Sequence, residues 1–234
     1  PLLVLTKGDS PHARAVVVAV AQGGKAGFLK RRARDIAVLL EQGMAVCLPD
    51  LRGTGETRAD DNRGRYSADT SRSATALMIG DTMVGARLRD LRAVLAWLRA
   101  RPDFDAKRIA LWGDSFAPIN PPGTDFNVPR RVSGQPRQSE PLGDLLALLG
   151  GLYEKDVAAV FTRGGLRNFA EVLGHFQVLV PHDVIVPGFA ATTDLTVLAK
   201  LQRAPVKRVS KVNHLNLRVS EEEGTAIWLA DRLR

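Results

Sequence analysis

A serine between small residues is the strongest chemical signal in this sequence. Residues 113–117 read GDSFA, and they directly follow the apolar run at 108–112. A strand that ends in such a tight turn has no room for large side chains two positions before or after the serine. The turn also presents the serine hydroxyl at the edge of a sheet, where it can act as a nucleophile in acyl transfer. The pattern therefore predicts that Ser115 is a nucleophile.

Short apolar runs alternate with amphipathic stretches, and this pattern predicts the elements that would position the serine. Strands are expected at residues 2–5, 15–21, 45–49, 108–112, 157–162, 206–209 and 215–219. Helices are expected at residues 30–42, 86–101, 142–153, 193–201 and 221–234. Strands that alternate with helices favour a mostly parallel sheet with helices on its faces. We therefore predict an α/β fold, and we expect residues 1–234 to form one domain because no internal repeat divides them.

The chain resembles the α/β-hydrolase family over roughly residues 13–165. Residues 113–117 match the nucleophile elbow G-x-S-x-G of that family, with Ala117 in place of the second glycine. Residues 50–56 (DLRGTGE) look like the D-x-R-G-x-G loop that follows an earlier strand in many hydrolases. The closest likeness is to the acetyl-xylan-esterase-like and prolyl-oligopeptidase-like branch. This resemblance implies the α/β-hydrolase fold, with a mostly parallel central sheet flanked by helices.

The resemblance also implies roles for the residues around Ser115. In the family, the backbone N–H that follows the nucleophile helps to bind the oxyanion, and here it belongs to Phe116. A second N–H comes from the turn after the first long strand, which here contains Gln22 and Gly23. The implied activity is that of a serine esterase, which hydrolyses small acyl or carbohydrate esters through an acyl-serine intermediate. No cofactor is implied, and a small-molecule ester is the expected partner.

The family's usual positions for a histidine base and its orienting carboxylate are unfilled, although a serine nucleophile needs both. The acid position, after strand 206–209, holds KVN at residues 211–213, and the histidine position holds SE at residues 220–221. Too few residues separate the last two strands for a parallel crossover. Three explanations remain: a hairpin, residues missing between Asn213 and His214, or a pruned active site.

Histidines elsewhere are therefore candidates for the base. His182 is preferred because it follows Ser115 in the chain and lies in a proline-bounded segment that could fold over the strand ends. His214 is the second candidate, since the hairpin alternative would place it near those ends. His12 is expected to be exposed and His175 to be structural, and the absence of any catalytic histidine also stays open.

Two carboxylates are candidates for the acid. Glu140 precedes the helix expected at 142–153, and it could instead only cap that helix. Asp183 is adjacent to His182, but neighbouring side chains of an extended chain point apart. We take Glu140 as the acid in the predicted site.

Residues 118–141 interrupt the alternating pattern. This segment contains six prolines and few apolar residues, and it is too long for an ordinary connection. We expect a lid-like insert that covers Ser115 and shapes substrate entry. An oligomer contact and a disordered loop are the alternatives.

Composition excludes several other functions. The chain has 33 basic and 25 acidic residues, a formal net charge of +8, but its arginines are scattered and only 6% of its residues are aromatic. We interpret the charge as a solvated surface and expect no nucleic-acid partner. No apolar run is long enough to span a membrane, so no membrane partner is expected. The single cysteine, Cys47, excludes a disulfide framework.

No metal site or nucleotide-binding motif is present in the sequence, because the H-E-x-x-H, P-loop and G-x-G-x-x-G patterns are absent. The main alternative to an esterase is a catalytically silent hydrolase fold that serves as a binding or structural module, and the unfilled triad positions favour it. A basic nucleic-acid-binding protein is the third hypothesis. The compartment, the oligomeric state and the substrate stay open.

Overall fold

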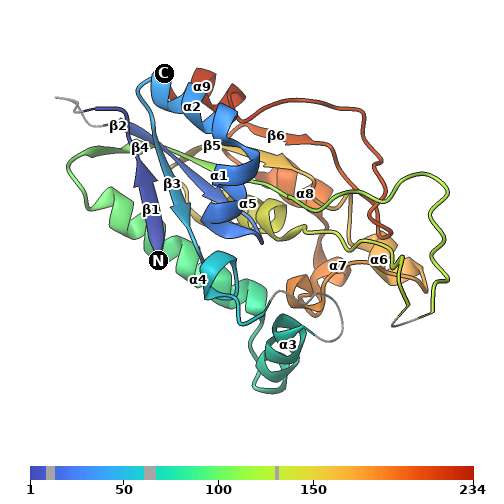
Figure 1. Ribbon diagram of the computed structural model, residues 1–234. Coiled ribbons are helices and arrows are strands. Elements are labelled where there is room, and N and C mark those ends of the chain that lie inside the picture. Colours follow the sequence, from blue (N-terminus) through green and yellow to red (C-terminus); the bar gives the residue numbers. More distant parts are fainter. Residues whose placement is uncertain (9–13, 61–66, 130–131) are drawn as a thin grey trace.

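A six-stranded sheet forms the centre of the protein (Figure 1). The computed structural model describes residues 1–8, 14–60, 67–129 and 132–234, so His12 lies outside the described residues. The strands are β1 (Leu2–Leu5), β2 (Arg14–Val20), β3 (Ala45–Pro49), β4 (Phe104–Gly113), β5 (Val157–Arg163) and β6 (Val206–Val209). They follow the order β1-β3-β2-β4-β5-β6, and among these strands only β1 is antiparallel to its neighbour. The prediction of a mostly parallel sheet is confirmed.

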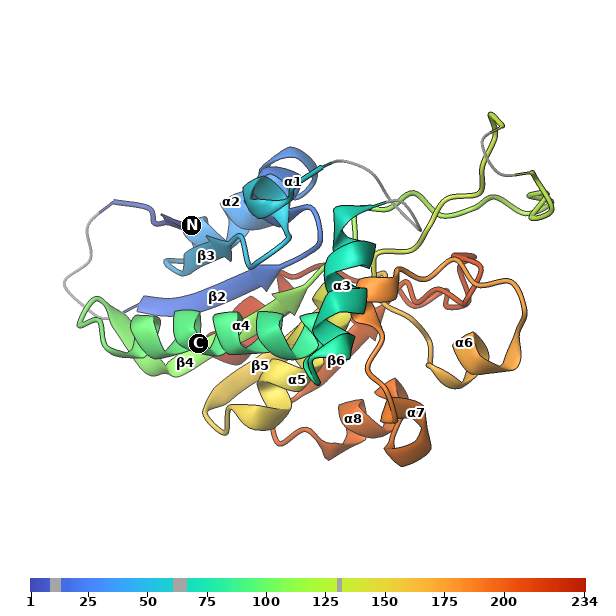
Figure 2. The same ribbon diagram turned by 90° about the horizontal axis from the view of Figure 1, so that it is seen from below.

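Helices cover both faces of this sheet, as the alternating pattern predicted (Figure 2). The helices on one face are α1 (Gly24–Arg31), α2 (Ala33–Glu41) and α9 (Trp228–Leu233). The helices on the other face are α4 (Met83–Arg99), α5 (Leu142–Tyr153) and α8 (Leu195–Leu201). The remaining helical segments are η1 (Gly55–Thr57), α3 (Ala68–Met78), α6 (Ala170–Gly174), η3 (His182–Val184) and α7 (Phe189–Thr192).

Strand β2 shows how the sequence builds this three-layer core. Val16 and Val18 belong to the cluster that packs against α4 and α5, whereas Val17 and Ala19 belong to the cluster under α1 and α2. Side chains alternate between the two faces of a strand, so a strand covered on both faces must be apolar throughout. The continuous β-branched run is thus explained by burial on both sides.

The helix expected at residues 30–42 is in fact two helices, α1 and α2, which meet at Arg32. Arg32 has a φ of −130°, outside the helical range. Its guanidinium makes two hydrogen bonds of 2.8 Å to the carboxylate of Asp114, which lies at the end of β4. This long-range ion pair accompanies the break, which the periodicity of the segment did not reveal. Helix α3 was likewise not predicted.

The strand expected at residues 215–219 is absent, so that prediction is wrong. Val212 and Arg218 instead form an isolated antiparallel bridge that closes a short turn. Asn216, within the turn, has a φ of 56°, a left-handed conformation that does not fit a strand. The structure therefore shows a reduced form of the hairpin alternative. The last helix is also shorter than expected, because residues 221–225 are not helical.

The proline-rich insert is held at both of its ends. Its described parts, residues 118–129 and 132–141, contain no helix or strand. The side-chain amide of Asn120 donates to the carbonyls of Arg137, at 2.9 Å, and Leu215, at 2.8 Å. Figure 2 shows the yellow-green segment between these anchors extending away from the sheet. The insert thus begins and ends beside the carboxyl end of β4, and its role as a lid stays a prediction.

Candidate active site

Ser115 follows the carboxyl end of β4, in a turn that two glycines allow. A Cβ atom on Gly113 would lie 2.2 Å from the carbonyl oxygen of Gly143, and one on Gly143 would lie 2.4 Å from that of Asp114. Any larger residue at either position would collide with backbone atoms. The glycines therefore let α5 begin in direct contact with the turn. In the sequence, α5 follows the insert.

A third glycine makes room for the serine side chain itself. Gly164 follows β5 and has a φ of +72°, and a Cβ atom there would lie 2.7 Å from the Cβ of Ser115. Ser115 is only half-buried, in contrast to Gly113 and Asp114 before it. Its side chain therefore lies at the surface of a pocket rather than within the core.

The pocket beside Ser115 has a volume of about 270 Å³. Four parts of the chain form its wall: the end of α1, the elbow with the start of the insert, the end of β5, and the turn at residues 210–218. The described residues that line it are Arg31, Arg32, Ser115, Phe116, Ala117, Pro118, Ile119, Arg163, Gly164, Ser210, Val212, Asn216 and Arg218. No histidine and no carboxylate is among them, so none of the described residues that line the pocket could act as a base for Ser115.

The buried carboxylate of Asp114 organises the elbow. Besides the two hydrogen bonds from Arg32, it accepts one from the backbone N–H of Ser115 at 2.8 Å and one from the indole of Trp112 at 3.0 Å. A carboxylate with this many donors is fixed in one orientation. Asp114, the second residue of the GDSFA turn, thus holds Arg32 at the pocket.

Phe116 and Glu140 are brought together, in an arrangement that the sequence did not predict. The backbone N–H of Phe116 donates to Oε2 of Glu140 at 3.1 Å, and Glu140 is 2% exposed. The Phe116 ring packs edge-on against Phe28, with ring centroids 5.1 Å apart. The N–H that was expected to bind an oxyanion therefore carries a carboxylate in this structure, and that carboxylate makes no contact with a histidine in the described part of the chain.

Gln22 and Gly23, the other expected oxyanion residues, lie in a turn against the loop at residues 50–56. The Gln22 amide donates to Asp69 at 3.4 Å. Gly23 faces the Phe116 ring, because a Cβ atom there would lie 2.9 Å from that ring. Neither residue lines the pocket beside Ser115. Their assignment as oxyanion donors stays a prediction.

His182, the preferred base, lies in η3 and is exposed. Its backbone carbonyl accepts a hydrogen bond of 3.3 Å from the hydroxyl of Ser73 on α3. The adjacent Asp183 is buried and pairs with Arg87 on α4. The structure thus does not bring His182 together with Ser115, and no contact between them is found in the described residues.

His214 takes part in a cluster that sequence reasoning missed. Its ring stacks on that of His175 with centroids 3.8 Å apart, and its Nδ1 lies 3.6 Å from Oε2 of Glu171. Burial lowers the pKa of His214, and the nearby His175 and Arg167 lower it further. The order serine, acid, histidine along the chain is compatible with Glu171, but it does not distinguish Glu171 from the other acidic residues between Ser115 and His214. The His214 ring does not line the pocket, although its neighbours in the turn do.

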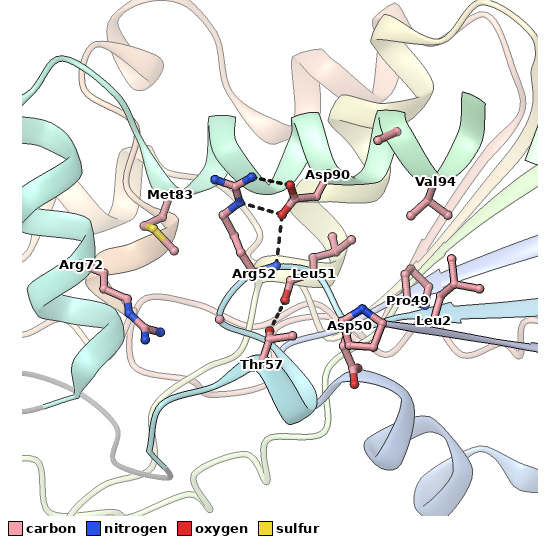
Figure 3. Close-up of a pocket in the computed structure, with 13 residues that line it drawn as sticks. Leu2, Pro49, Asp50, Leu51, Arg52, Thr57, Arg72, Met83, Asp90 and Val94 are labelled. Carbon is pink, nitrogen blue, oxygen red and sulfur yellow. Dashed lines mark hydrogen bonds and ion pairs between the residues drawn. The ribbon is translucent and has the colours of Figure 1, made fainter. Parts of the chain in front are cut away.

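A larger pocket of about 740 Å³ lies elsewhere, between the start of β1, the loop after β3 and helix α4 (Figure 3). Arg52 and Asp90 point toward each other there, and Nε and Nη2 of Arg52 donate to the Asp90 oxygens at 2.7 and 2.6 Å. Arg52 thus ties its loop to α4. This pocket contains no serine or histidine among its described lining residues.

Among the described residues, no group of three or more histidine, cysteine, aspartate or glutamate side chains could hold a metal ion. Cys47 is buried, and this burial raises the pKa of its thiol to about 12. No single described helix is long and apolar enough to cross a membrane; the segments His182–Thr192 and Leu195–Leu201, bent by 71° at their junction, reach that length and apolar composition only when taken together.

Comparison with known proteins places this fold. No protein-family profile and no curated protein sequence matches the chain. A solved structure from Bacteroides fragilis, described as a candidate acetyl xylan esterase, matches with a TM-score of 0.67 and 15% identity, over 90% of this chain and 55% of that protein. A glucuronoyl esterase from Solibacter usitatus matches with a TM-score of 0.50 and 14% identity, over 88% of this chain and 58% of that protein.

The chain therefore spans little more than half the length of these two proteins. At such low identity the likeness concerns the fold and not the activity. It agrees with the resemblance seen in the elbow and in the loop at residues 50–56. The protein has the α/β-hydrolase fold, and the solved structures similar to it include a candidate acetyl xylan esterase and a glucuronoyl esterase.

Proposed function

We propose that the protein is a carboxylic ester hydrolase with Ser115 as its nucleophile, acting on small acyl or carbohydrate esters. The observation that carries this proposal is the position of Ser115, which follows the central strand β4 and faces a pocket. Gly113, Gly143 and Gly164 support the proposal, because a side chain at any of them would collide with the neighbouring strand, helix or serine. Ser115 Oγ attacks the ester carbonyl carbon, the alcohol leaves, and water then hydrolyses the acyl-serine.

We infer that the base is His214, oriented by Glu171. Of the described histidines, His214 has a carboxylate 3.6 Å from its Nδ1, and it belongs to the turn that lines the pocket. At 3.6 Å this contact is longer than a hydrogen bond. The carboxylate must therefore move closer to Nδ1 before it can hold the imidazole in the tautomer whose Nε2 accepts the serine proton. Because the ring now stacks on His175, it must leave that stack and turn toward Ser115 before it can act.

The oxyanion donor in this proposal is the backbone N–H of Phe116. One such donor contributes about 10²–10³ in kcat. In the structure this N–H is bonded to Glu140, so the substrate oxygen must displace that carboxylate. The chain as described is therefore in a resting arrangement, in which both the donor and the base are engaged elsewhere.

A catalytically silent binding module is the second candidate. Two observations favour it: no described histidine lines the pocket, and the Phe116 N–H is occupied. A silent protein would keep this resting arrangement permanently. A fluorophosphonate probe separates the two candidates, because it labels only an activated serine.

The decisive experiment combines labelling with hydrolysis of p-nitrophenyl acetate. We expect the wild type to be labelled and Ser115→Ala to be unlabelled and inactive. We expect His214→Ala to lose at least about 10²-fold in kcat, as for removal of a general base, and His182→Ala to retain nearly full activity. An unlabelled wild type, with circular dichroism showing a folded chain, would favour the silent module.

A further inference from the structure

We propose that the pocket beside Ser115 binds a small anionic group, and that this group is a carboxylate or phosphate carried by the ester substrate. The pocket could bind an anion whether or not the protein is an enzyme. The idea that this anion is part of the ester substrate rests on the proposed function. Of the described residues that line the pocket, four are arginines and none is acidic. These arginines are Arg31, Arg32, Arg163 and Arg218.

One of the four arginines is already neutralised. Arg32 donates two hydrogen bonds of 2.8 Å to Asp114, and its guanidinium lies 5.4 Å from the centroid of the Phe116 ring. A bidentate pair of this kind leaves little charge for a ligand. Arg32 therefore shapes the pocket wall, and the positive charge available to a ligand comes from the other three arginines.

Arg163 is the most deeply placed of those three, with a side chain 17% exposed. Its nearest carboxylate oxygens, on Asp35 and Asp114, lie 3.7 and 3.9 Å away, which is too long for a hydrogen bond. Its one hydrogen bond among the described residues goes to the carbonyl of Gly224 at 2.7 Å. A guanidinium has five N–H donors, so most of those on Arg163, which lines the pocket, make no hydrogen bond to the described residues.

The pKa of Arg163 is lowered, which also indicates that its positive charge is incompletely compensated. Burial is the main cause that lowers its pKa; Asp114 raises it in part, Arg32 lowers it further, and Asp35 raises it least, so that the pKa stays below its usual value. The charged form is therefore only partly compensated by the protein. An anion in the pocket would supply the missing compensation, because a carboxylate or phosphate fits the planar fork of a guanidinium.

Arg31 and Arg218 add positive charge at the pocket mouth. Both side chains are exposed, and in the described part of the chain neither has a carboxylate oxygen within 4.0 Å. They come from α1 and from the turn after β6, on different sides of the pocket. An anion that enters thus meets arginines from separate elements.

The size of the pocket limits what the anion belongs to. A volume of about 270 Å³ accommodates a small molecule only. Because Ser115 and Arg163 line this same space, an ester carbonyl at the serine and an anionic group at the arginine would be parts of one small molecule. A monoester of a short dicarboxylic acid, or an ester that carries a phosphate, has this form.

Anion binding is tested first, in the Ser115→Ala protein, so that no reaction takes place. Inorganic phosphate and glutarate are titrated separately by calorimetry, at an ionic strength held constant with sodium chloride. We expect saturable binding of at least one of them and a higher Tm at saturation. Binding of phosphate alone or of glutarate alone would identify the preferred anion.

Matched variants locate the site. Arg218→Ala and Arg163→Met should each weaken binding about tenfold or more, as the loss of one charge-assisted contact predicts. Arg203→Ala, an exposed arginine that does not line the pocket, should leave it unchanged. If Arg163→Met does not fold, the exposed Arg31 and Arg218 still carry the test. Equal affinity in all variants, or no saturation, would overturn anion binding.

Turnover tests the second half of the proposal. The wild type is given mono-p-nitrophenyl glutarate and the neutral p-nitrophenyl valerate, a chain of equal length, with the uncatalysed rates subtracted. We expect kcat/KM to be at least about tenfold higher for the anionic ester, and the preference to disappear in Arg218→Ala. Equal values would overturn the assignment of the anion to the substrate. If neither ester is hydrolysed while phosphate still binds, the proposed esterase function fails and the anion site stands.

Discussion

The carboxylate of Glu140 lies where a substrate oxyanion would accept a hydrogen bond from Phe116. Two negative oxygens cannot share one N–H donor, and their repulsion in a buried site raises the cost of forming the oxyanion. Glu140→Gln keeps an oxygen acceptor for the N–H and removes the negative charge. We therefore expect this variant to raise kcat/KM for p-nitrophenyl acetate by about two- to tenfold.

The same variant separates two roles for this residue. As the acid of a triad, which the sequence suggested, Glu140 would orient a histidine, and its replacement would lower kcat strongly. Asp144→Asn is not a suitable control, because that buried carboxylate pairs with Arg208. Glu56→Gln changes an exposed carboxylate away from the pocket and serves instead. A tenfold loss in Glu140→Gln alone would restore the triad interpretation.

His214 predicts the pH dependence of the reaction. Its pKa is lowered below the usual 6.5, first by burial and then by His175 and Arg167, while Glu171 faces it from α6. A base acts in its neutral form, so kcat/KM should fall on the acid side with a midpoint below pH 6.5. The pH profile of kcat/KM measures this midpoint. A midpoint above 6.5, or one unchanged in a His175→Ala variant, would argue against His214 as the base.

Stability should follow pH with the same sign. Because the folded chain holds His214 with a lowered pKa, the unfolded chain binds more protons just below pH 6.5. The contribution of His214 to stability is therefore present above that pH and is lost as the pH falls toward the folded pKa. Urea unfolding of wild type and His214→Gln between pH 5 and 8 should show a smaller loss in the variant.

Helix α4 is joined to α3, to η3 and to the loop after β3 by a buried ion network. Arg87 is fully buried, pairs with Asp183 of η3, and lies 3.8 Å from Asp69 of α3. Its Nε also donates to the carbonyl of Arg52 at 2.9 Å. One side chain thus connects three segments that are far apart in the sequence, although its spacing on the helix gives no sign of this.

Removing Arg87 should therefore be costly. Arg87→Met would leave the buried carboxylate of Asp183 without its counterion, and breaking a buried pair in this way costs about 3–5 kcal/mol. Asp69 would keep Arg58 and Arg72, each 3.8 Å away. Arg89→Met, on the same helix, removes an exposed pair with Asp81 and should cost at most about 1 kcal/mol. Urea unfolding compares the two. Similar losses in both variants would show that the buried network contributes little.

Periodicity predicted the regular elements well where packing on the sheet decides them. The strands at 45–49 and 206–209 and the helix at 142–153 have the predicted bounds. Two departures from the predicted elements occur where local periodicity gives no signal. The ion pair of Arg32 accompanies the break between two helices, and the left-handed residue Asn216 replaces a strand with a turn.

The candidate site was predictable only in part, for a related reason. The small residues around Ser115 are a local requirement of the turn, so the sequence shows them directly. The pairing of His214 with Glu171 and the approach of Arg163 to Ser115 depend on how separate elements meet. Such meetings leave no local pattern in the sequence.

At the scale of the whole molecule, the positive charge is divided between two uses. The arginines of α4 are largely paired with acidic residues, as Arg92 and Arg99 are with Glu154. Those at the pocket beside Ser115 are not all paired, and the chain as a whole carries a formal charge of +8. Its field therefore attracts anions in general, and the pocket is a place where an anion can be held.

This field predicts how salt affects turnover. The Debye length falls from about 30 Å at 0.01 M salt to about 10 Å at 0.1 M, so long-range attraction of an anionic ester weakens over that range. We expect kcat/KM for mono-p-nitrophenyl glutarate to fall several-fold between these concentrations of sodium chloride, and that for p-nitrophenyl valerate to stay nearly constant. Parallel slopes for the two esters would mean that salt acts on the fold or on the chemistry. A steeper slope for the anionic ester that flattens in Arg218→Ala, but not in Arg203→Ala, would show that the attraction ends at the arginines beside Ser115.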